Sequence, residues 1–109
     1  MLTIIEVSDI IHRRTRYSLT KNNVALIYVK FNMDKTHAHI YFILNTDLKA
    51  NECTAMELRF ERMFADKCDV YSVTVLNKTN HFTKDASTYL LWTKRAGFIA
   101  EPEIDNIAK

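Results

Sequence analysis

Three apolar-rich segments place their side chains on two faces with a period of two, which is typical of β-strands with one buried face. The segments are residues 24–31, 36–44 and 69–76. One side of these strands carries Ala25, Ile27, Val29, Phe31, Ala38, Ile40, Phe42, Leu44, Tyr71, Val73 and Val75. We expect this side to face the core. A fourth strand is predicted at residues 2–7, "LTIIEV", because the segment is short, apolar and rich in β-branched residues.

A different period marks the main helix, within residues 45–67. Its apolar residues recur at three- and four-residue spacing, the pattern of a helix laid on a sheet. They are Cys53, Met56, Phe60, Met63 and Phe64. Thr46 or Asn51 is a candidate N-cap, so the pattern leaves the start of this helix open.

Two further helices are predicted at the ends of the chain. Ser8 is a suitable N-cap for a helix over residues 8–18. Thr83 is a suitable cap for "KDASTYLLWTKRA", and Gly97 is a natural C-terminal stop. Lys94 and Arg95 would then stabilise the last turn through the helix dipole.

These elements follow one another in the order β-α-β-β-α-β-α. With right-handed crossovers, this order predicts an α+β fold, a two-layer ferredoxin-like sandwich with a mostly antiparallel sheet and helices on one face. The alternative is an α+β domain whose mostly antiparallel sheet has another strand order. The length of 109 residues indicates one domain. We assign it to residues 1–98 and treat residues 99–109 as an acidic C-terminal tail, since Glu101, Glu103 and Asp105 fall there.

The composition of the chain argues against several classes of function. The chain has one glycine and one proline, which excludes a glycine-rich phosphate loop and argues against long linkers. The net charge of +2 is too small to indicate nucleic acid by itself. Cys53 and Cys68 are expected to be free thiols in a reducing compartment. No signal peptide or apolar run long enough for a membrane span is visible, so we expect a cytoplasmic protein without a membrane partner.

The candidate site lies on the other side of the predicted strands. His37, His39 and Tyr41 share that side of one strand, and Tyr28 and Lys30 share it on the neighbouring strand. Ser72 and Thr74 should lie nearby. One interpretation is a plain sheet face, either solvated or packed under the last helix with Leu91 and Trp92.

A second interpretation is nucleic-acid binding, with bases stacked on the exposed rings and phosphates neutralised by basic residues. The topology over residues 2–76 resembles that of RNA-recognition motifs, which bind RNA on the open face of a ferredoxin-like sheet. This resemblance implies RNA as the favoured ligand. The predicted binding residues are Tyr28, Lys30, His37, His39, Tyr41, Arg13, Arg14 and Arg16. The three arginines form a basic cluster on the first helix, which is also consistent with an ordinary solvated helix face.

Two other hypotheses stay open. The "HAH" at residues 37–39 is similar to the His-hydrophobic-His motif of rolling-circle initiators and relaxases, which implies a metal-dependent DNA nickase with Tyr89 as nucleophile. Because only two ligands are evident, we expect no metal site, no cofactor and no catalytic residue. The alternative to nucleic acid is a protein target, with the chain acting as a regulator or inhibitor, for example a phage accessory protein acting on a host factor.

Overall fold

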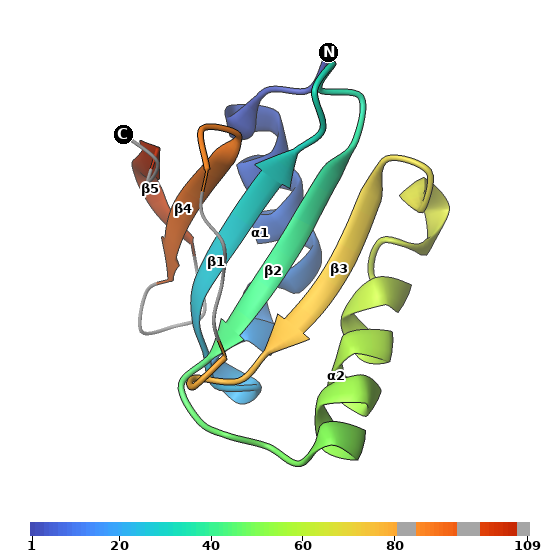
Figure 1. The fold of residues 1–109 in the computed structure, drawn as a ribbon, viewed down its shortest axis with the longest axis vertical. Coiled ribbons are helices and arrows are strands. Elements are labelled where there is room, and N and C mark those ends of the chain that lie inside the picture. Colours follow the sequence, from blue (N-terminus) through green and yellow to red (C-terminus); the bar gives the residue numbers. More distant parts are fainter. Residues whose placement is uncertain (81–84, 94–98, 107–109) are drawn as a thin grey trace.

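Five strands form one sheet in the order β3-β2-β1-β4-β5 in the computed structural model, which describes residues 1–80, 85–93 and 99–106 (Figure 1). The strands are β1 (Val24–Phe31), β2 (Ala38–Leu44), β3 (Tyr71–Leu76), β4 (Thr88–Thr93) and β5 (Ile99–Asn106). β1 pairs antiparallel with both β2 and β4, β4 pairs antiparallel with β5, and β2 and β3 are parallel.

The parallel pair needs a long connection, because two strands that run in the same direction cannot be joined by a tight turn. Helix α2 (Ala50–Arg62) and the short 3-10 helix η1 (Ala65–Lys67) supply it. The predicted α+β class is therefore confirmed for the described residues, which form a mixed sheet and two α-helices. The ferredoxin-like arrangement is not confirmed.

The predicted strand at residues 2–7 is wrong, because this segment belongs to helix α1 (Ile4–Lys21). The N-cap is Thr3 and not Ser8: the Thr3 hydroxyl accepts a hydrogen bond from the Glu6 backbone N–H at 3.2 Å. Val7, Ile10 and Ile11 are buried, and their three- and four-residue spacing continues through the rest of the helix. Burial of this stripe outweighs the local β preference of the first residues.

The predicted last helix is also wrong, because Thr88–Thr93 forms β4 beside β1. The proposed cap Thr83 and the end of that helix, with Lys94, Arg95 and Gly97, lie outside the described residues. Residues 99–106 of the predicted acidic tail form β5, which pairs with β4. The division of the chain at residue 98 stays a prediction.

The core lies on one side of the sheet, between the strands and both helices. Figure 1 shows α1 behind the sheet and α2 alongside β3. The rings of Phe42 on β2 and Phe60 on α2 stack with centroids 4.2 Å apart. The predicted burial of Ile40, Phe42, Phe60 and Val73 in one cluster is confirmed.

The inward side of β1 differs from the prediction at one position. A register irregularity between Val24 and Leu26 places Val24 in the core in place of Ala25, which is half-buried. At the outer edge of β3, the Glu57 carboxylate on α2 accepts the Val75 backbone N–H at 2.9 Å, so the helix caps part of this edge. Among the described residues, neither helix has the length and hydropathy needed to cross a membrane.

Candidate nucleic-acid interface

Five predicted site residues come together on the sheet side opposite the helices, and we call Tyr28, Lys30, His37, His39 and Tyr41 the sheet-face cluster. The β1–β2 register sets Tyr28 opposite Tyr41 and Lys30 opposite His39. His37 directly precedes β2. All five side chains are half-buried, so each presents part of its surface to solvent. The rings of His39 and Tyr41 stack on each other, with centroids 4.3 Å apart and planes 15° apart.

The two histidines are held by hydroxyl groups of β3. His37 Nε2 lies 2.6 Å from Ser72 Oγ, and His39 Nε2 lies 2.6 Å from Thr74 Oγ1. The other ring nitrogen of His37 is 3.3 Å from the Asp69 carbonyl oxygen. These contacts fix both rings across two strands. The sequence prediction that Ser72 and Thr74 lie near the histidines is confirmed.

Burial lowers the pKa of His39, and the charge of His37 lowers it further, while Glu57 raises it and Lys30 lowers it. The imidazole is therefore favoured in its neutral, less strongly hydrated form. A neutral ring offers a flat apolar surface, which suits stacking against another ring. Among the residues that the structure describes, no three His, Cys, Asp or Glu side chains are grouped to hold a metal ion.

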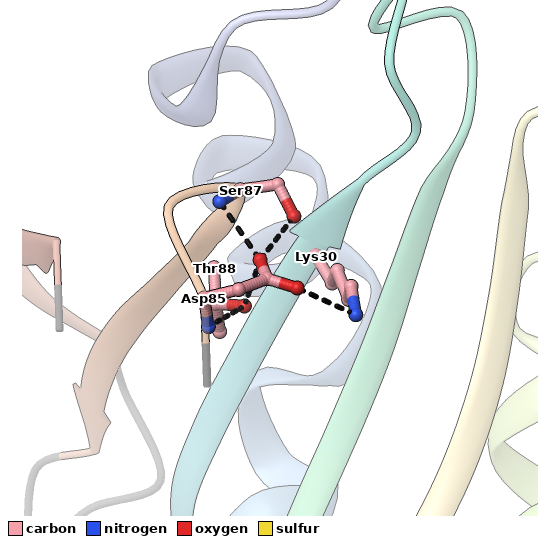
Figure 2. A network of polar contacts seen from close by, with 4 residues as sticks. All are labelled: Lys30, Asp85, Ser87 and Thr88. Atoms are coloured by element: carbon pink, nitrogen blue, oxygen red, sulfur yellow. Dashed lines mark hydrogen bonds and ion pairs between the residues drawn. The ribbon is translucent and has the colours of Figure 1, made fainter. Parts of the chain in front are cut away.

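Lys30 belongs to a polar network at one end of the sheet-face cluster, shown in Figure 2. Its ammonium lies 2.9 Å from the Asp85 carboxylate. The same carboxylate accepts hydrogen bonds from the Ser87 backbone N–H at 2.9 Å, from the Ser87 hydroxyl and from the Thr88 hydroxyl at 3.2 Å. The Ser87 hydroxyl, the Lys30 ammonium and the other donors hold the pKa of Asp85 far below its usual range.

Sequence reasoning missed this network because it placed Asp85 and Ser87 in a helix. The available signal was Asp-x-Ser-Thr at residues 85–88, since an Asp whose carboxylate bonds the backbone two residues later forms an Asx turn. The Phe31 backbone N–H donates to the Ser87 carbonyl at 3.0 Å, which holds this turn at the end of β1. Because the turn carries Asp85, the charge of Lys30 is balanced by an ion pair within the protein.

The β4 side of this face is covered. Leu90 pairs with Tyr28 and Thr88 pairs with Lys30, so both side chains lie on the same face as the sheet-face cluster. Thr88 and Leu90 are nevertheless buried. Among the residues whose burial is described, the partly exposed side chains of this face therefore lie on β1, β2 and β3.

The predicted arginines are not brought to the sheet-face cluster, because α1 packs on the other side of the sheet. Arg13 contacts Asp9 at 3.5 Å, one helical turn away. Arg14 forms two bonds to Asp66, at 2.6 and 3.1 Å, and one to the Met63 carbonyl at 2.9 Å. This pairing raises the pKa of Arg14 and lowers that of Asp66.

The third arginine, Arg16, lies over the ring of Tyr17, with 4.5 Å between its guanidinium carbon and the ring centroid, and donates to the Tyr17 hydroxyl at 2.8 Å. All three arginines thus engage neighbours in the helix layer.

Tyr89, the nucleophile of the nickase hypothesis, lies on the opposite side of the sheet from the histidines. It pairs with the buried Val29, packs against the core and meets the Phe31 ring edge-on at 5.7 Å. Successive side chains of a strand point to opposite faces of the sheet, and a side chain on one face cannot reach the other face. Tyr89 therefore does not form a site with His37 and His39 in this fold.

The two cysteines are free thiols, as predicted. Cys53 Sγ lies 3.1 Å from the side-chain oxygen of Asn77. Burial raises the pKa of the Cys53 thiol, and the nearby carboxylates of Glu52, Glu57 and Asp47 raise it further. The thiolate form that a nucleophile requires is therefore disfavoured at this position.

Comparison with known proteins found no matching family model and no curated protein or solved structure with significant similarity to this chain.

Proposed function

We propose that the protein is a non-enzymatic nucleic-acid-binding module that holds a single-stranded segment on the sheet-face cluster. One observation carries the proposal: the rings of Tyr28, His39 and Tyr41 lie half-exposed at neighbouring positions of β1 and β2, on the face that the helices leave uncovered. Base stacking on aromatic side chains contributes about 1–3 kcal/mol per base, whichever base is present.

RNA is the favoured ligand, because single-stranded RNA is commonly bound by splaying its bases onto rings of this kind. Stacking would dominate the affinity. The cation of the sheet-face cluster, Lys30, is already paired with Asp85, so few phosphate counterions would be released on binding. Each neutralised phosphate of a single strand adds about −0.7 to the slope of log affinity against log salt. We therefore expect a shallow salt dependence.

The test is fluorescence anisotropy with short, labelled single-stranded RNA and DNA, using the Tyr41→Ala variant. The variant should lose about 1–3 kcal/mol of binding free energy for each stacked base removed, with RNA binding the wild type more tightly than DNA. The matched control is Tyr17→Ala, because Tyr17 is 70% exposed but lies on α1 on the other side of the sheet. Equal affinities of wild type and Tyr41→Ala, or no binding to either polymer, would contradict the proposal.

A second candidate is a protein-binding regulator or inhibitor, including a phage protein that acts on a host factor. The observation that favours it is the low charge of the sheet-face cluster, whose cation is neutralised and whose rings include two tyrosines. Protein interfaces are enriched in tyrosine and depleted of lysine at their centres. A pull-down with and without nuclease separates the candidates: a nuclease-resistant partner lost in Tyr41→Ala supports protein binding, and a nuclease-sensitive one supports nucleic acid.

A further inference from the structure

The helix layer contains a cleft of about 460 Å³ between the end of α1 and the second half of α2. Two contacts join the helices beside it. Arg14 donates to the Met63 carbonyl at 2.9 Å, and Arg59 donates to the Asn22 side-chain oxygen at 3.3 Å. Ser18, which lines the cleft, is one helical turn from Arg14 and one from Asn22. The cleft therefore lies between these two hydrogen bonds, which join α1 to the end of α2.

The lining combines apolar and cationic groups. It consists of Ser18, Lys21, Asn22, Arg59, Phe60 and Met63. Met63 supplies the accessible apolar part, since Phe60 behind it is buried. Lys21 and Arg59 supply two positive charges, and none of the six residues is acidic. This combination is complementary to a molecule with an apolar body and a negative group.

Helix C-termini carry partial negative charge, which would oppose an anion at this place. Here two of the carbonyls, those of Ser18 and Met63, already accept side-chain hydrogen bonds. The Asn22 side-chain amide donates to the Ser18 carbonyl at 2.8 Å, and Arg14 covers the Met63 carbonyl. The nearby Asp66 carboxylate is bound by Arg14. Lys21 and Arg59 are therefore the charged groups of the lining that an anion would meet first.

We propose that this cleft binds a small amphipathic anion, with its apolar body on Met63 and its negative group near Lys21 and Arg59. The volume falls within the range of about 300–1,000 Å³ found for small-molecule sites. The site belongs to the helix layer, across the sheet from the sheet-face cluster. It is therefore independent of the function proposed above.

The test is an NMR titration of the isotope-labelled protein with octanoate, 1-octanol and acetate. Octanoate has both the apolar body and the charge, whereas each of the other probes lacks one of them. We expect octanoate to shift the amide resonances of Ser18, Lys21, Asn22 and Arg59, and to bind at least about tenfold more tightly than acetate because it buries methylene groups.

The charged half of the site is tested with the Lys21→Glu/Arg59→Glu double variant. It should bind octanoate about tenfold more weakly than wild type, since two attractions become repulsions. Arg13→Glu, a charge reversal on α1 outside the cleft, should bind as wild type does. Shifts located elsewhere, equal binding of acetate and octanoate, or unchanged affinity in the double variant would overturn the proposal.

Discussion

The two faces of the sheet are made from alternating residues of the same strands, but they differ in how their side chains are satisfied. On the helix-covered face, Phe42 stacks on Phe60 and the neighbouring side chains are almost entirely apolar. On the other face, His39 pairs with Thr74 and Lys30 with Asp85, and the rings stay half-exposed. Burial of apolar side chains on the first face stabilises the fold. On the second face, hydrogen bonds and an ion pair hold side chains that remain partly exposed to solvent.

This comparison predicts that substitutions on the two faces have separable effects. The largest is expected for Phe60→Ala, because Phe60 is 1% exposed and its ring fills the space between α2 and β2. The free energy of unfolding should fall by about 3–5 kcal/mol in urea denaturation. Leu58→Ala, on the same helix but 48% exposed, should change it by less than about 0.5 kcal/mol. Equal stability of Phe60→Ala and wild type would show that the helix does not pack as described.

An intermediate effect is expected for Asp85→Asn, which removes a carboxylate that balances Lys30 and accepts three hydrogen bonds. Stability at neutral pH should fall, while affinity for single-stranded RNA should rise, because Lys30 becomes available to a phosphate. The salt dependence of binding should become steeper. Asp9→Asn, which loses only an exposed contact with Arg13, should change neither quantity.

The difference in stability between wild type and Asp85→Asn should depend on pH, because the pKa of Asp85 is lowered in the folded protein. The carboxylate stabilises the fold above its ordinary pKa of 3.8, and this contribution is lost as the pH falls towards the lower pKa of the folded state. Denaturation curves of wild type and Asp85→Asn should therefore converge on acidification. A constant difference from neutral to acidic pH would mean that the ion pair does not stabilise the fold.

The smallest effect is expected for His39→Gln. The pKa of His39 is lowered from its ordinary value of 6.5, so the unfolded chain binds a proton that the folded chain resists. Wild-type stability should begin to decline as the pH falls through 6.5, and the variant should decline less. Urea denaturation between neutral and mildly acidic pH measures how stability changes with pH in each protein. The same change in wild type and His39→Gln would contradict a lowered pKa of His39 in the folded protein.

The central elements could be predicted from the sequence because their signals are local. The period of two in residues 24–31 and 36–44 identified β1, β2 and, except at Val24 and Ala25, the side of each strand that faces the core. The stripe that includes Met56 and Phe60 identified α2. These same patterns located the sheet-face cluster, because the residues between the buried ones must point to the other side.

The ends of the chain could not be predicted in this way because their structures depend on distant partners. The apolar run Tyr89–Trp92 is short enough to suit a helix or a strand, and pairing with β1 decides for the strand. At the other end, β-branched residues favoured a strand, yet Val7 and Ile10 are buried as part of α1. The Asp85–Lys30 pair was missed for the same reason, since it joins residues far apart in sequence.

The most direct test of the proposed function is an NMR titration of the isotope-labelled protein with unlabelled single-stranded RNA. We expect the shifts to concentrate on amides of β1 and β2 around Tyr28, Lys30, His39 and Tyr41, with α1 and α2 unchanged. Shifts confined to the helix layer, or no shifts at concentrations that saturate the anisotropy signal, would contradict the claim that this face of the sheet binds nucleic acid.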